Sequence, residues 1–264
     1  MTDDKSANSP AAKTREWTSS SSPKKPNVGV HYDTEWTRTR PATILRNVVS
    51  TLFIGPISRF ICSPSVHGFE AIAGERQPLI FAPNHVSHFD TLAFLCAIPA
   101  TYRKNIVVAA AVDNFFNTRW KCVFYSLFLS TIPVERTRTN RKSADIAAGL
   151  LDRGYNLLIF PEGGRSFTDE MMEFHGGAAY LAKRCNIPVV PVYLQGVRKI
   201  LPKGSSRVRR ASIDVFFCAA LRPYPGADGG KPEDARRFTI RIQDALVALG
   251  AKRAPETGDS SATE

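Results

Sequence analysis

The sequence lacks a run of about 20 consecutive apolar residues, which is the length that a helix needs to cross the hydrocarbon of a bilayer. Its longest uncharged stretches, 47–58 and 122–134, are shorter and have charged residues on both sides. The opening residues, MTDDKSANSP, have no apolar core of the kind found in a secretory signal. We therefore expect no transmembrane helix and no secretory leader. The two uncharged stretches remain candidates for contact with a membrane surface.

Closely spaced cysteines are also lacking. The five cysteines are scattered along the chain, and no two stand at the short spacing of a zinc knuckle or a redox motif. They are expected to be reduced and buried in a cytosolic protein.

Acidic residues are in deficit, with 24 Asp and Glu against 35 Lys and Arg, which gives a net charge of +11. Such a surplus favours a polyanionic partner: a nucleic acid, an anionic membrane surface or a phosphorylated substrate. The sequence shows no recognition helix or platform of alternating basic and aromatic residues, so no nucleic-acid partner is expected. The apolar fraction of 43% is that of a globular protein.

Polar residues dominate both ends of the 264-residue chain. Residues 1–40, which contain SSSSPKKP, and residues 252–264 carry too few apolar side chains to offset chain entropy. We expect both to be disordered tails around one domain, 41–251.

Residues 41–62 at the start of this domain have the spacing of an amphipathic helix. The apolar positions are Ile44, Leu45, Val48, Val49, Leu52, Phe53, Ile57, Phe60 and Ile61. Pro56 is expected to kink or split the helix. Such a stripe fits a helix packed on the core, or one that lies in a bilayer interface with its cations near lipid phosphates.

Short apolar runs then alternate with helical patterns. Strands are expected at 78–82, 105–111, 129–134, 156–160, 188–194 and 212–218. Helices are expected at 91–98, 141–153, 174–185 and 233–249. This alternation predicts an α/β fold with a mixed, largely parallel sheet covered by helices, after an N-terminal amphipathic helical element.

The segment LIFAPNHVSHFDT places His85 and Asp90 at the end of an expected strand. On one continuous helix, side chains five residues apart would point about 140° apart, so the two can meet only across a turn. A carboxylate beside an imidazole fixes its tautomer and stabilises its cation, as a general base requires. Two alternatives stay open: His85, His88 and Asp90 as metal ligands, as in a metal-dependent hydrolase, or His85 as a core or capping residue.

The segment NLLIFPEGGRSFTDE follows another buried strand and ends in a Gly-Gly turn. Ligand sites gather at the carboxyl ends of parallel strands. Arg165 offers a planar fork suited to phosphate. Glu162 would repel a phosphate, so we expect it to orient Arg165 or to accept a hydrogen bond from a substrate hydroxyl. The alternative is a tight polar turn.

Two further segments flank these motifs. In STIPVERTRT, Arg136 directly follows an expected strand, with Arg138 close behind as a surface charge. The segment CNIPVVPVYLQG is expected to be structural and to line the floor of the site.

The order of these blocks, NHVSHFD, IPVER, FPEGGRS and VPVYLQG, resembles that of the glycerolipid acyltransferase family, whose type member is 1-acyl-sn-glycerol-3-phosphate acyltransferase. The resemblance covers 79–196, about half of the chain. It implies that His85 is the general base and Asp90 its orienting partner. The residues that it places around the glycerol phosphate of the acceptor are Arg136, Glu162, Gly163, Arg165 and Ser166.

The resemblance also implies an O-acyltransferase of phospholipid biosynthesis. An acyl thioester on coenzyme A or acyl carrier protein would acylate a lysophospholipid, with 1-acyl-glycerol-3-phosphate as the first candidate, and no metal or cofactor would take part. The implied place is the cytoplasmic face of an anionic membrane, with contact through 41–62 and the aromatic residues of 120–128. Gly164 stands where the family usually has Thr, Glu135 where it has Asp, and His175 where it often has Lys. The last change removes a cation, so acceptors other than lysophosphatidate stay open.

Overall fold

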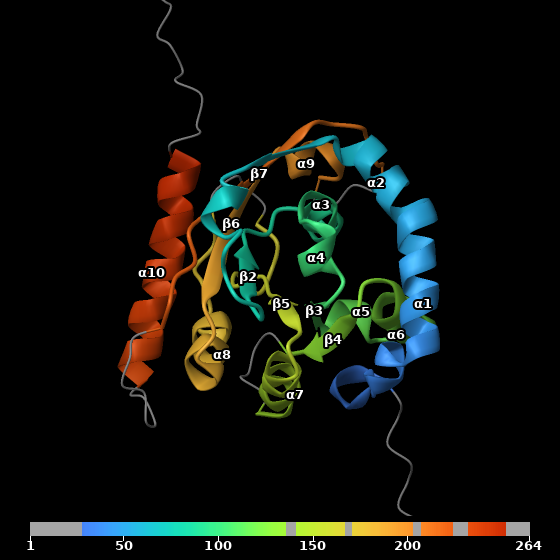
Figure 1. Cartoon of the computed structure of the whole chain (residues 1–264), viewed down its shortest axis with the longest axis horizontal. Helices are drawn as coiled ribbons and strands as arrows, with labels where there is room; N and C mark the ends of the chain where they lie inside the picture. Colours follow the sequence, from blue (N-terminus) through green and yellow to red (C-terminus); the bar gives the residue numbers. More distant parts are fainter. Residues whose placement is uncertain (1–27, 136–140, 167–170, 203–206, 224–231, 252–264) are drawn as a thin grey trace, which may run out of the picture.

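A seven-stranded sheet forms the centre of the computed structural model, which describes residues 28–135, 141–166, 171–202, 207–223 and 232–251 (Figure 1). Its strands are β1 (Pro64–His67), β2 (Ile80–Pro83), β3 (Ile106–Ala111), β4 (Thr131–Val134), β5 (Asn156–Leu158), β6 (Val189–Gln195) and β7 (Ile213–Phe217). Their order is β1-β7-β6-β2-β5-β3-β4. Every neighbouring pair is parallel except β6 and β7. The expected mixed, largely parallel α/β fold is confirmed.

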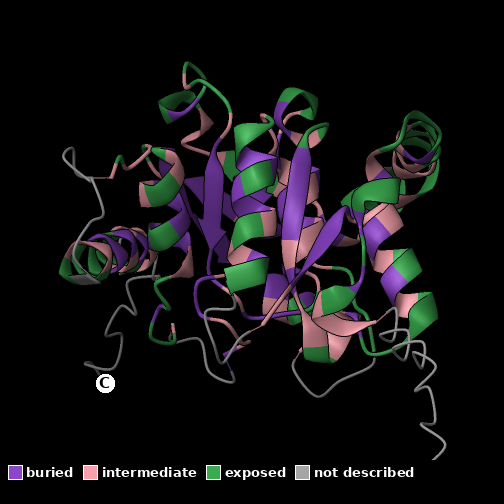
Figure 2. Cartoon of the chain, turned by 90° about the horizontal axis from the view of Figure 1, so that it is seen from below, coloured by how far each residue is buried: buried purple, intermediate pink, exposed green. Residues whose placement is uncertain are grey.

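Helices cover both faces of this sheet. They are α1 (Arg40–Val49), α2 (Gly55–Cys62), α3 (Asp90–Ala97), α4 (Ala100–Arg103), α5 (Val112–Phe115), α6 (Arg119–Phe128), α7 (Arg141–Asp152), α8 (Gly177–Cys185), α9 (Val197–Ile200) and α10 (Pro232–Ala251). The apolar faces of α7, α8 and α10 pack on one side of the sheet, and α2, α3, α4 and α9 pack on the other. Figure 2 shows the buried strands between helices whose outer faces are exposed.

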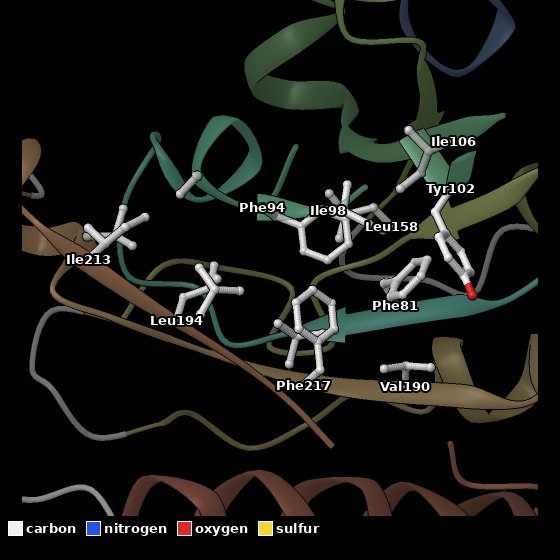
Figure 3. Close-up of a cluster of buried hydrophobic side chains, with 14 of the residues drawn as sticks. Phe81, Phe94, Ile98, Tyr102, Ile106, Leu158, Val190, Leu194, Ile213 and Phe217 are labelled. Atoms are coloured by element: carbon white, nitrogen blue, oxygen red, sulfur yellow. The ribbon is translucent and has the colours of Figure 1, made fainter. Parts of the chain in front are cut away.

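Alternation along the strands produces this two-sided core. Ile80 and Ala82 of β2 face α7, α8 and α10, whereas Phe81 faces α3 and α4. Phe81 is fully buried and meets the rings of Phe94 and Phe217 with centroid distances of 5.1 and 6.5 Å (Figure 3). Removing a buried Phe side chain costs about 3–5 kcal/mol, so this cluster strongly stabilises the strand that carries the site.

The expected strands and helices occur within a few residues of their predicted bounds. Sequence analysis missed β1 and the short helices α4, α5 and α9. It also missed α6, most of which lies in the uncharged stretch 122–134. The strand β1 is four residues long, begins at a proline and leaves its middle residues exposed, so it has neither the length nor the alternation that marks a strand.

Residues 28–39 differ from the expected polar tail, because they are ordered on the domain. Tyr32 and Thr37 are buried, and the Tyr32 ring packs on Phe116 with centroids 5.9 Å apart. The backbone N–H of Gly29 donates to the Phe116 carbonyl at 2.9 Å. The ordered domain therefore begins before residue 41. Residues 1–27 and 252–264 lie outside the described residues, and their disorder stays a prediction.

The predicted helix 41–62 is one continuous helix, Arg40–Cys62, in which a π-helical segment, Ser50–Ile54, joins α1 to α2. Pro56 follows this π-helical segment and does not split the helix. By length and composition this 23-residue helix can cross a membrane, so the expectation that no stretch is long enough was wrong. These two properties do not distinguish a helix that spans a bilayer from one that lies on its surface.

Candidate active site

The two motif loops meet at the carboxyl ends of β2 and β5, which are neighbouring parallel strands. His85 lies just after β2, and Glu162 lies after β5. The backbone N–H of Ser166 donates to the His85 carbonyl at 2.9 Å, and the His85 N–H donates to Glu162 Oε1 at 2.7 Å. These bonds hold the loops together, so the motifs form one site.

His85 and Asp90 are in direct contact, as their spacing predicts. His85 Nδ1 lies 2.8 Å from Asp90 Oδ2, and the same oxygen accepts the backbone N–H groups of Val86 and Ser87 at 2.7 and 2.8 Å. The residues between strand and helix therefore turn around one carboxylate oxygen. Asp90 opens α3, where the positive end of the helix dipole further favours a carboxylate.

Burial distinguishes the two partners. The Asp90 side chain is fully buried, whereas the His85 side chain is 16% exposed. Burial raises the pKa of Asp90, and the hydrogen bonds from His85, Ser87 and Val86 oppose that rise. The Phe160 ring stacks on the imidazole, with centroids 4.1 Å apart and planes at 26°. With Nδ1 and one ring face occupied, Nε2 is the nitrogen available to a ligand.

Glu162 bonds to the backbone of the site, and its expected contact with a substrate hydroxyl stays a prediction. Its side chain is 1% exposed, and its two oxygens accept the backbone N–H groups of His85 at 2.7 Å and Met172 at 3.0 Å. The carboxyl group thus fixes the backbone of both loops. Burial raises the pKa of Glu162 to about 7, against the effect of these two hydrogen bonds.

Gly163 is required for steric reasons. Its φ is +62°, and a Cβ there would lie 2.5 Å from the His175 ring. Gly164 has neither constraint within the described structure. His175 itself is anchored by its backbone N–H, which donates to the Pro161 carbonyl at 2.7 Å. The residue that replaces the family's frequent Lys therefore stands against the motif loop.

A cavity of about 520 Å³ opens beside His85. His85, His88 and His175 lie on its wall, together with small residues such as Ala109 and Gly177. Pockets of about 300–1,000 Å³ with mostly apolar walls and a few polar groups are typical of small-molecule sites.

The block VPVYLQG supports the site without lining this cavity. It forms β6, which pairs with β2. Asn84 fixes that pairing, because its Nδ2 donates to the Leu194 carbonyl at 3.1 Å and its Oδ1 accepts the Leu194 N–H at 2.7 Å. The expected position of β6 on the floor of the site is therefore wrong.

The structure brings together most of the predicted site residues: His85, Asp90, Glu162, Gly163, Arg165 and Ser166. Ser166 is buried and Arg165 half-buried. Arg136 and Arg138 lie outside the described residues. Sequence analysis missed the stacking of Phe160, for which the sequence offers only adjacency to the motif.

The geometry gives the metal alternative no ligand set. The described residues contain no group of three His, Cys, Asp or Glu side chains placed to hold a metal ion. His88, the third residue of that alternative, is exposed, and its ring lies edge-on to Phe115 at 6.3 Å.

Comparisons with known proteins agree with this architecture. A putative 1-acyl-sn-glycerol-3-phosphate acyltransferase of Caenorhabditis elegans is 30% identical over 206 residues, which cover 75% of this chain and 68% of that protein. The 1-acyl-sn-glycerol-3-phosphate acyltransferase of Cocos nucifera is 28% identical over 148 residues, or 54% of this chain. The chain spans 46% of the coconut protein and 57% of a Chlamydomonas reinhardtii relative.

A solved structure shares the fold. The crystal structure of the 1-acyl-sn-glycerophosphate acyltransferase PlsC from Thermotoga maritima matches with a TM-score of 0.59 and 18% identity, over 83% of this chain and 86% of that one. The model of the family described as Acyltransferase matches residues 63–195, which contain both motif loops. The chain belongs to the Acyltransferase family.

Proposed function

We propose that this protein is an O-acyltransferase that moves a fatty acyl group from an acyl thioester to the hydroxyl of a lysophospholipid. The preferred acceptor is 1-acyl-glycerol-3-phosphate, which gives phosphatidate. Family membership and the names of the relatives support the reaction class. The observation that carries the proposal is the 2.8 Å contact of His85 Nδ1 with the buried Asp90 carboxylate, with His85 on the wall of a largely apolar cavity.

His85 acts as the general base in this proposal. Asp90 accepts a hydrogen bond from the Nδ1–H group and so leaves the Nε2 lone pair facing the acceptor hydroxyl. The hydroxyl oxygen attacks the thioester carbonyl while Nε2 takes its proton. The tetrahedral intermediate collapses, the C–S bond breaks, and the thiolate leaves with the proton from Nε2. General-base catalysis of this kind contributes about 10²–10⁴-fold.

The cavity beside His85 accommodates the acyl chain. Its wall includes Val108, Ala109, Ala147 and Leu181, whose side chains offer apolar contact. Each methylene that leaves water for such a surface contributes about 0.8 kcal/mol. A chain held there places its thioester carbonyl at the mouth, beside the imidazole.

Arg165 binds the phosphate of the acceptor in this proposal, together with Arg136. Arg165 is half-buried on the loop whose Ser166 N–H bonds to the His85 carbonyl. Arg165→Ala is expected to raise the KM for the lysolipid more than the KM for the thioester. Equal increases in the two constants would contradict a phosphate-binding role.

The protein meets its lipid substrate at the cytoplasmic face of an anionic membrane. Large apolar side chains of Arg40–Cys62 are 47–63% exposed: Ile44, Leu45, Val48, Leu52, Phe53, Ile57 and Phe60. On α6, Trp120 and Phe124 are 65% and 47% exposed. Contiguous exposed apolar surface of this kind marks membrane contact. Phe53→Ser with Phe60→Ser is expected to reduce flotation of the protein with anionic vesicles.

The decisive experiment offers the purified protein a panel of lysolipids with acyl-CoA and with acyl carrier protein donors, and identifies the products by mass. Phosphatidate formed from 1-acyl-glycerol-3-phosphate confirms the proposed acceptor. If only a different lysolipid is acylated, the proposed reaction class stands and the proposed acceptor is wrong. Free fatty acid as the only product would contradict acyl transfer.

A further inference from the structure

A second cavity, of about 620 Å³, lies under the middle of the helix Arg40–Cys62. The helix contacts α6 through α1 and α3 through α2, and the cavity lies between these contacts. Figure 1 shows the helix as the outer edge of the molecule, on the side opposite α10. Leu92, Leu95 and Phe128 give the body side of the cavity an apolar wall.

Four cations line this cavity: Arg46, Arg59, Arg103 and Lys104. None of its lining residues is acidic. Within the described part of the chain, none of the four has a carboxylate within 4.0 Å, whereas Arg153 and Arg184 elsewhere on the surface do. The cavity therefore concentrates positive charge without an internal counter-ion.

Two of these cations are oriented by hydrogen bonds to backbone carbonyls. Arg59, Arg103 and the Cys96 side chain all line this cavity. Arg103 is oriented by its Nη1, which donates to the Leu95 carbonyl at 3.0 Å. Arg46 is half-buried and donates to the Thr37 carbonyl at 3.2 Å. These contacts hold the guanidinium groups of Arg46 and Arg103 beside the apolar wall.

The roof of the cavity is the π-helical segment Ser50–Ile54, which contributes Ser50, Thr51 and Ile54. Gly55 follows it, where a Cβ would lie 2.8 Å from the Ser50 carbonyl oxygen. Single-turn π segments inside α-helices occur frequently at functional sites. Here Ser50 and Thr51 of this segment line the same cavity as the four cations.

We propose that this cavity binds an anionic glycerophospholipid of the bilayer, with its phosphate at Arg59 and Arg103 and an acyl chain against Leu92, Leu95 and Phe128. The exposed apolar face of Arg40–Cys62 brings the cavity to the lipid surface. Guanidinium forks bind phosphate through charge-assisted hydrogen bonds, and the apolar wall accounts for the tail. This site is separate from His85 and does not depend on acyl transfer.

The test measures lipid binding to the full chain in detergent by native mass spectrometry, with phosphatidylglycerol and phosphatidylcholine of identical chains and without any acyl donor. Phosphatidylglycerol is expected to bind at least about tenfold more tightly than phosphatidylcholine, and Arg59→Gln with Arg103→Gln should reduce its affinity by at least about tenfold. Arg236→Gln with Arg237→Gln, at exposed positions of α10, removes the same charge and should leave binding unchanged.

Two further arms keep the test decisive. Thr51→Trp fills the cavity from an exposed position without changing charge, and it should also weaken phosphatidylglycerol binding. His85→Ala should bind as the unmodified protein does, which separates this site from the acyl-transfer site. The proposal is overturned if the two lipids bind equally, or if the folded Arg59→Gln/Arg103→Gln protein binds phosphatidylglycerol as the unmodified protein does. It is also overturned if inorganic phosphate, at the same concentration as the lipid, displaces phosphatidylglycerol.

Discussion

Among the residues that the structure describes, two His–Asp pairs have almost the same contact distance. His85 Nδ1 lies 2.8 Å from Asp90 Oδ2, and His67 Nε2 lies 2.9 Å from Asp214 Oδ1. Each imidazole also stacks on a phenylalanine: His85 on Phe160 at 4.1 Å and His67 on Phe216 at 4.6 Å. Contact distance and stacking therefore do not distinguish them.

Burial distinguishes the pairs. The side chains of His67 and Asp214 are 41% and 45% exposed, on two neighbouring strands at the edge of the sheet, whereas Asp90 is fully buried. Asp90 also accepts hydrogen bonds from two backbone N–H groups, and the imidazole of its partner His85 borders a cavity. Water screens the outer pair, so its interaction is worth about 1 kcal/mol or less. The comparison shows that the two pairs differ in their surroundings and not in their contact geometry.

The largest expected difference between the two pairs is in kcat when the carboxylate of each, Asp90 or Asp214, is replaced. Asp90→Asn is expected to lower kcat for acyl transfer by about 10³–10⁴-fold, because the amide no longer holds the Nδ1–H tautomer. Asp214→Asn serves as the matched control and should leave kcat unchanged. The measurement is product formation at saturating substrates, with the fold checked by circular dichroism. If kcat of Asp90→Asn fell by less than tenfold, the proposed functional difference between the two pairs would be contradicted.

The buried carboxyl group of Glu162 beside His85 makes a prediction about how stability depends on pH. Burial raises its pKa in the folded protein to about 7, from an ordinary value of 4.5. The folded state therefore holds the proton more tightly than the unfolded state. This contribution to stability is complete below pH 4.5 and is lost as the pH rises through about 7.

The predicted slope is measurable. Between pH 4.5 and 7 the free energy of unfolding should fall by about 2–3 kcal/mol through this group. In Glu162→Gln that part of the slope should vanish, although the protein is less stable overall because an amide group faces a backbone donor. Urea unfolding from pH 5 to 8 gives both curves. Parallel curves for the two proteins would contradict the raised pKa.

The glycine pair tests the steric part of the site with a smaller effect. Gly163→Ala should lower the free energy of unfolding by about 1–2 kcal/mol, because its φ of +62° disfavours a side chain and the Cβ meets His175. Gly164→Ala, where a Cβ meets nothing within 4 Å, should stay within about 0.5 kcal/mol of the unmodified protein. Equal losses in the two variants would refute this account of the turn.

The outer pair gives the smallest expected effect. His67→Gln should change the free energy of unfolding by less than about 1 kcal/mol, since both side chains are screened by water. Thermal or urea unfolding measures the change. A loss as large as that of a core substitution would show that the edge pair is structural.

Sequence analysis reached the main features of the site for physical reasons. A separation of five residues requires a turn for His85 and Asp90 to meet, and alternating strands and helices place both motifs at the carboxyl ends of parallel strands. Other features depend on contacts between distant segments. The bond from the His85 N–H to Glu162 joins residues 77 positions apart, so the sequence suggested a substrate or Arg165 as the partner of Glu162.

The outer elements show the same limit. The order of residues 28–39 comes from contacts with Phe116 rather than from their own composition. The helix Arg40–Cys62 was predicted by its spacing, but the cavity under it forms only when α3 and α6 pack beside it. Local patterns therefore predict elements, and tertiary contacts decide what lies between them.

The most direct test of the central claim compares His85→Ala with His67→Ala in the transfer of an acyl group from a thioester to 1-acyl-glycerol-3-phosphate. The account predicts that His85→Ala folds normally and forms no measurable product, while His67→Ala keeps the unmodified rate. Unmodified turnover in a folded His85→Ala protein would contradict the role of this imidazole as the general base.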